Sequence, residues 1–113
     1  MEAKNTFVDI ELENGETVKA TLTFYYLLKL KNMNRGLYER YNKVMTKGPQ
    51  DEFDNITLLY AAYMCAQIAE GTDEDAMDEE EFLSVLSPDR EYMAQLLQLL
   101  VNPKKARASA ARS

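Results

Sequence analysis

The sequence predicts an α+β domain that is mostly helical, with an N-terminal β-hairpin followed by about five helices in a small bundle. Two short segments near the N-terminus alternate apolar and polar residues, as half-buried strands do. From residue 24 onward, the apolar residues recur with helical spacing, and residues typical of helix caps separate the segments. We therefore expect one domain over residues 1–101. Residues 102–113 are basic and lack an apolar pattern, which predicts a disordered tail.

The hairpin is predicted from residues 6–12 and 17–22, which each place alternate apolar side chains on one face. A two-residue Asn-Gly turn would put Ile10 opposite Lys19 and mix the two faces. A three-residue loop of residues 13–15, with its glycine in a left-handed conformation, avoids this conflict. The expected cross-strand pairs are Ile10 with Val18 and Val8 with Ala20.

Two helices are predicted next, over about residues 24–32 and 35–47. Thr23 is the expected N-cap of the first helix. Asn34 and Gly36 interrupt the apolar spacing between them, which indicates a kink or a short turn. A Gly-Pro pair is expected to end the second helix.

Residues 51–70 carry the strongest helix signal, because they open with three acidic residues and end at Gly71. Between Leu58 and Ala66 every residue is apolar or tyrosine. A helix of this kind must be covered on most sides. We expect it either at the centre of the bundle or in an oligomer interface.

Two further helices are predicted after an acidic loop over residues 72–77. Asp78 and Glu81 have the spacing of a capping pair, which predicts a short helix of about eight residues. Ser87-Pro88-Asp89 resembles a helix start, with a serine cap and proline at the first helical position. The helix that follows is expected to extend to Val101.

Composition and charge exclude several functional classes. The chain has 13 basic and 19 acidic residues, a net charge of −6, with one cysteine and no histidine or tryptophan. Intramolecular disulfides, histidine-based triads and Cys/His zinc sites are therefore excluded. Residues 1–101 carry 9 cations and 19 carboxylates, and the remaining residues carry 4 cations and no carboxylate. Nucleic-acid binding by so acidic a domain is not expected, and no apolar run is long enough for a membrane span.

No cofactor, metal site or catalytic residue is predicted. A calcium loop starting at Asp73 fails, because Met77, Asp78 and Ser84 occupy positions that need a ligand, a glycine and a glutamate. The acidic residues cluster in loops and caps, which does not favour a two-carboxylate hydrolase. Cys65 lies in an apolar helix, where it is expected to be a core residue.

Seven tyrosines and six methionines are more than so small a core requires. Both residue types are favoured on surfaces that bind proteins, although they can also fill a helical core. Taken together with the nearly all-apolar helix, this content indicates a protein that binds other proteins.

The order and composition of these elements resemble the tail assembly chaperones of long-tailed bacteriophages. The resemblance covers residues 6–101 and rests on the hairpin ending in Leu-Thr-Phe, GLYERYNKV, ITLLYAAYMCA, the acidic linker before EEEFLSVL, and the leucine-rich last helix. It implies a small protein of the host cytoplasm that binds and solubilises the tape measure protein. It also implies displacement as tail tube protein polymerises, and absence from the mature virion. Such proteins are often made in a second, longer form by frameshifting, for which Pro103-Lys104-Lys105 is a candidate position.

The expected partners are therefore the tape measure protein, the tail tube protein and further copies of the chain, as a homo-oligomer. The partner-binding residues that we expect first lie on the last helix and tail: Tyr92, Leu96, Leu99, Lys104 and Lys105. A second set lies on the apolar helix: Tyr60, Tyr63 and Met64. Two alternatives remain open, a structural head-to-tail adaptor of a phage particle and an acidic regulatory module that binds a protein by imitating nucleic acid.

Overall fold

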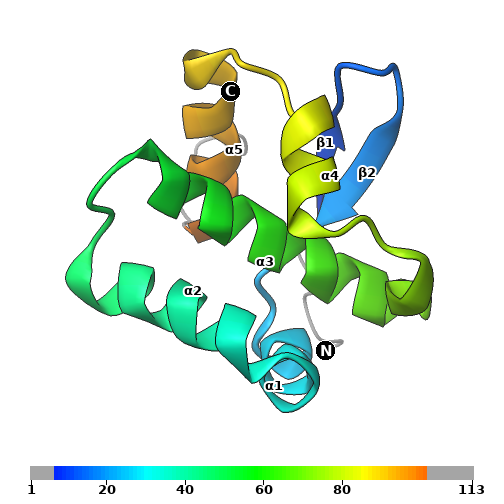
Figure 1. Cartoon of the computed structure of the whole chain (residues 1–113), viewed down its shortest axis with the longest axis vertical. Coiled ribbons are helices and arrows are strands. Elements are labelled where there is room, and N and C mark those ends of the chain that lie inside the picture. Colours follow the sequence, from blue (N-terminus) through cyan, green and yellow to red (C-terminus); the bar gives the residue numbers. More distant parts are fainter. Residues whose placement is uncertain (1–6, 102–113) are drawn as a thin grey trace, which may run out of the picture.

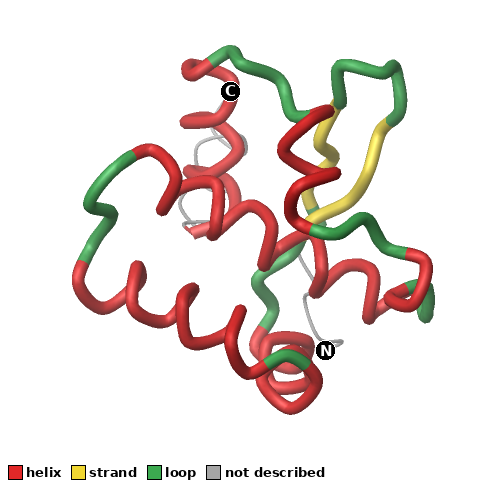
Figure 2. Tube along the Cα trace, in the orientation of Figure 1, coloured by secondary structure: helices red, strands yellow, loops and turns green. Residues whose placement is uncertain are grey.

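A two-stranded antiparallel hairpin leads into five α-helices in the computed structural model of the chain, which describes residues 7–101 (Figure 1). The elements are β1 (Val8–Glu11), β2 (Thr17–Ala20), α1 (Phe24–Met33), α2 (Arg35–Lys47), α3 (Glu52–Glu70), a 3-10 turn η1 (Asp73–Asp75), α4 (Glu79–Val85) and α5 (Arg90–Val101). Figure 2 shows that helices dominate these residues. The predicted fold class is confirmed. The predicted disordered tail lies outside the described residues.

The hairpin has the predicted register, with Ile10 opposite Val18 and Val8 opposite Ala20. The backbone N–H of Leu12 donates to the carbonyl of Glu16 at 2.8 Å, which leaves the predicted three-residue loop between them. Gly15 closes this loop at φ 90°, a conformation that costs a glycine little because it has no Cβ. The alternation of apolar residues was therefore a better guide to the turn than the Asn-Gly pair.

Helix α1 starts where predicted and its N-cap residue is Thr23, as expected, but no side-chain capping hydrogen bond forms. Thr23 occupies the N-cap position, yet its hydroxyl lies 2.7 Å from the Thr21 hydroxyl and makes no cap hydrogen bond. Because Thr21 engages this hydroxyl, the first turn is joined to Thr23 only through the Thr23 carbonyl. Asn34 separates α1 from α2, and its side chain accepts a hydrogen bond from the N–H of Leu37.

Helix α3 crosses the centre of the molecule, with α1 and α2 on one side and α4, α5 and the hairpin on the other (Figure 1). It begins with Asp51, whose carboxylate accepts the N–H of Asp54, and it ends at Gly71 in a left-handed conformation. Leu59, Ala62 and seven other residues of this helix are buried. The first of the two predicted environments, the centre of the bundle, is therefore the one observed.

The start predicted for α5 is wrong by two residues. The helix begins at Arg90, and the Asp89 carboxylate accepts hydrogen bonds from the N–H groups of Glu91 and Tyr92. Ser87 instead accepts a hydrogen bond from the N–H of Asp89, before the helix begins. An aspartate nearer the helix thus replaces the serine as the cap. For α4, the predicted Asp78 cap is confirmed by its 2.8 Å hydrogen bond from the N–H of Glu81.

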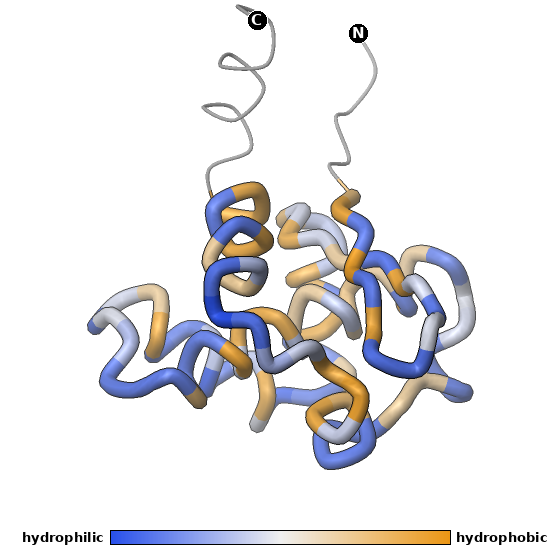
Figure 3. Tube along the Cα trace, turned by 90° about the horizontal axis from the view of Figure 1, so that it is seen from above, coloured by the Kyte–Doolittle hydropathy of each residue, from blue (hydrophilic) through white to orange (hydrophobic). Residues whose placement is uncertain are grey.

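The core brings together side chains from the hairpin and all five α-helices. Its largest fully buried members include Phe82 from α4, Ile10 from β1 and Leu30 from α1. Figure 3 shows hydrophobic and hydrophilic residues alternating along the helices around this core. Burying one such large side chain contributes about 1.5–3 kcal/mol to stability, so α4 is held mainly by Phe82 despite its short length.

Candidate protein-contact surfaces

Tyr60 and Tyr63, which were expected on an oligomer or client surface, lie in the core with exposed fractions of 7% and 3%. Their rings pack against Phe82, with centroid separations of 5.5 Å and 5.0 Å. Met64, the third residue of that set, is half-buried and packs against the same core. We therefore assign no surface contact to Tyr60 and Tyr63.

The hydroxyls of these two tyrosines fasten the acidic linker to α3. The Tyr60 hydroxyl donates to the carbonyl of Met77 at 2.9 Å, and the Tyr63 hydroxyl accepts from the N–H of Met77 at 2.9 Å. Burial raises the pKa of Tyr60 to about 12, with nearby carboxylates such as Glu79 adding to the effect. Burial also raises the pKa of Tyr63. Both phenols are therefore uncharged near neutral pH and act as hydrogen-bonding groups.

Of the residues expected first for partner contact, the three that the structure describes do not form one exposed surface. The Tyr92 hydroxyl accepts a hydrogen bond from the N–H of Glu11 at 2.9 Å, which attaches α5 to β1. Leu96 is buried, whereas Leu99 is 40% exposed. Lys104 and Lys105 lie outside the described residues. Among the described residues of this set, Leu99 is the one with an exposed side chain.

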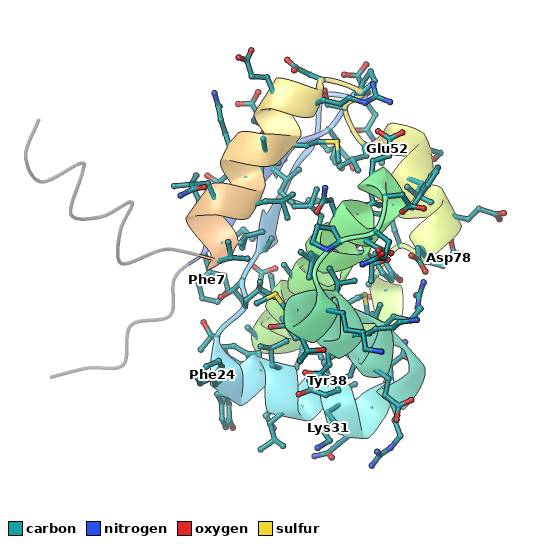
Figure 4. All side chains as sticks on the ribbon, turned by 90° about the vertical axis from the view of Figure 1, so that its left-hand side faces the viewer. Phe7, Phe24, Lys31, Tyr38, Glu52 and Asp78 are labelled. Carbon is teal, nitrogen blue, oxygen red and sulfur yellow. The ribbon has the colours of Figure 1, made fainter. Side chains whose placement is uncertain are left out.

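A different surface was missed by the sequence reasoning: the outward side of α1. Phe24, Tyr25 and Leu28 are 86%, 59% and 56% exposed, and their spacing of three and four residues brings them onto one face. We call these three residues the α1 outer face. Figure 4 shows Phe24 at the start of α1, directed away from the domain. The opposite side of the same helix carries the buried Leu27 and Leu30. Helix α1 is thus apolar on two faces, and the domain covers only one of them.

Charge is divided within the domain as well as between the domain and the tail. Residues 24–47, which form α1 and α2, contain six cations and one carboxylate, a net charge of +5. The other described residues contain two cations and seventeen carboxylates, a net charge of −15. The α1 outer face therefore lies on the cationic part of an acidic domain.

Cys65, the one cysteine of the chain, lies in the core. It is fully buried, and burial raises its pKa to about 12. The thiol is therefore protonated at neutral pH, whereas a nucleophilic cysteine must be a thiolate. Among residues 7–101, no group of three or more acidic or cysteine side chains is placed to hold a metal ion.

Comparison with models of protein families, with curated proteins and with solved structures gives no match. Within the described part of the chain, none of the helices combines the length and apolar character that a membrane span requires.

Proposed function

We propose that the protein is a tail assembly chaperone of a long-tailed bacteriophage. In this role it binds and solubilises the tape measure protein in the host cytoplasm and helps recruit tail tube protein. It acts as a homo-oligomer, is absent from the mature virion, and has a longer form produced by frameshifting near Pro103. The order of the hairpin and helices supports this proposal through the sequence resemblance.

The single observation that carries the proposal is the α1 outer face. A holder of a long helical client needs exposed apolar side chains on a carrier that is otherwise strongly charged. Phe24, Tyr25 and Leu28 provide such side chains in a described domain of net charge −10. Covering one of them fully is worth about 1.5–3 kcal/mol, so burying all three against a client favours binding.

Two measurements test the proposal: the formation of tails without the gene, and the amount of the protein in purified virions. Deleting the gene should abolish tails, and quantitative mass spectrometry of purified wild-type virions should find the protein far below one copy per particle. Its stoichiometric presence would contradict the chaperone role and favour the structural head-to-tail adaptor. Normal tails after deletion would instead favour the acidic regulatory module.

A further inference from the structure

An open cleft of about 680 Å³ separates α2 from the first turns of α3. The chain connecting these helices (Figure 1) contributes Gly48 and Gln50 to its lining. One wall carries Lys43 and Lys47 of α2, and the other carries Phe53 of α3. Val44 and Thr57, both buried, also line the cleft. The cleft therefore has two lysines on its α2 wall, and on its α3 wall the Phe53 ring between the carboxylates of Asp51 and Asp54.

Lys43 and Lys47 differ from the other cations of the described region. Residues 7–101 contain eight cations, of which Lys19, Arg35, Arg40 and Arg90 form ion pairs. Two more, Lys29 and Lys31, lie over the rings of Tyr25 and Tyr38 at 5.1 Å and 5.6 Å from the ring centroids. Lys43 and Lys47 have neither kind of partner among the described residues. The two cations without an ion pair or a ring contact among the described residues therefore line the same cleft.

The carboxylates on the opposite side of the cleft are already engaged. Asp51 accepts the N–H of Asp54, and Asp54 accepts the N–H of Gln50 at 2.6 Å. Each carboxylate thus accepts a backbone N–H at the start of α3 and keeps its charge, and among the described residues neither forms an ion pair with Lys43 or Lys47. Phe53, between them in sequence, is 61% exposed and provides apolar surface at the rim.

We propose that this cleft binds an amphipathic helix of a partner protein, with two carboxylates one turn apart facing Lys43 and Lys47 and an apolar side chain against Phe53. The two lysines are four residues apart on α2, so they lie about 6 Å apart along the helix axis, the spacing of carboxylates at positions i and i+4 of a partner helix. A helix laid in a groove between two others is a common mode of peptide recognition. The lysines select the acidic helix, and Phe53 adds the apolar contact. This inference uses only the cleft and does not depend on the proposed function.

The probe is a fluorescein-labelled, alanine-rich helical peptide of about 16 residues, long enough to form a helix. It carries Glu at positions i and i+4 and a Leu beside them, and the control peptide carries Gln in place of both Glu residues. Fluorescence anisotropy in about 50 mM salt should show saturable binding of the Glu peptide, and at least about fivefold weaker binding of the Gln peptide. Backbone amide shifts in NMR spectra should move mainly in residues 43–57.

Two double variants separate the cleft from general charge attraction. Lys43→Gln with Lys47→Gln should weaken peptide binding about tenfold, a loss of about 1.4 kcal/mol. Lys29→Gln with Lys31→Gln removes the same charge from the neighbouring helix α1 and should change binding less than about twofold. Phe53→Ser should weaken binding about threefold or more while circular dichroism stays unchanged.

Several results would overturn the inference. These are no binding of the Glu peptide, equal binding of both peptides, or equal losses from the two lysine pairs. Binding to vesicles containing anionic lipid that needs Lys43 and Lys47, without peptide binding, would instead assign the cleft to a membrane surface.

Discussion

The backbone N–H of Met77 donates a hydrogen bond of 2.9 Å to the hydroxyl of Tyr63, fourteen residues earlier in the chain. The hydroxyl of Tyr60 donates to the carbonyl of the same methionine. The two tyrosines of one helix thus satisfy both backbone groups of a single linker residue. This arrangement fixes the point at which the acidic linker enters α4, and it places Phe82 against both rings.

Replacing Tyr63 with phenylalanine should destabilise the fold by about 1–2 kcal/mol, because the N–H of the half-buried Met77 loses its partner. Urea denaturation measures this change. The matched control is Tyr25→Phe at an exposed position, which should change stability by less than about 0.5 kcal/mol. Equal effects of the two substitutions would contradict the role assigned to the Tyr63 hydroxyl.

Stability should fall at alkaline pH. Burial raises the pKa of Tyr41 and of Tyr60 to about 12, above the ordinary tyrosine value of about 10. Because the fold favours the neutral phenols, their contribution is complete below about pH 10 and is lost as the pH rises toward 12. Thermal unfolding at a series of pH values measures this loss, and the Tyr60→Phe variant should show a shallower decline. A melting temperature that stays constant from pH 9 to pH 12, about the range of the two pKa values, would argue against these buried phenols.

Cys65 should react slowly with a thiol reagent in the folded protein. Its side chain is fully buried and its pKa is raised to about 12, so neither access nor a thiolate is available near neutral pH. The rate of colour release from Ellman's reagent should rise to that of a free thiol in denaturant. A fast reaction without denaturant would show that α3 is accessible in the native state.

Two phenylalanines provide a direct comparison of core and surface. Phe82→Ala should cost about 3–5 kcal/mol, because it empties a fully buried position between Tyr60 and Tyr63. Phe53→Ala, at a 61% exposed position, should cost less than about 0.5 kcal/mol. Urea denaturation of both variants measures the two losses of unfolding free energy. Similar losses would mean that α4 packs differently from the structure described.

The sequence predicted the fold better than the contact surface. Period-two alternation determined the register of Ile10 and Val18, and helical spacing together with capping residues located all five α-helices. Both signals are local, and the structure obeys them. Thr23 is the N-cap residue as predicted, but its hydroxyl is hydrogen-bonded to Thr21 and not to the first turn, and sequence spacing does not rank such alternative hydrogen bonds.

Tyr60 and Tyr63 illustrate why the surface could not be predicted in the same way. Between Leu58 and Ala66 of α3 every residue is apolar or tyrosine, so periodicity cannot tell which side of this stretch faces solvent. Their burial depends on Met77 and Phe82, which come from another part of the chain. The exposed Phe24 and Leu28 did carry a signal, because they lie on the side of α1 opposite Leu27 and Leu30.

The most direct test of the proposed chaperone function is co-expression with a tape measure protein, with the soluble fraction of that protein measured. The wild-type chain should keep it soluble. A variant with Phe24→Ser and Leu28→Ser should fold normally by circular dichroism and lose this effect, because both side chains are exposed in the domain alone. A client equally soluble with the variant, or without the chain at all, would contradict the chaperone function carried by the α1 outer face.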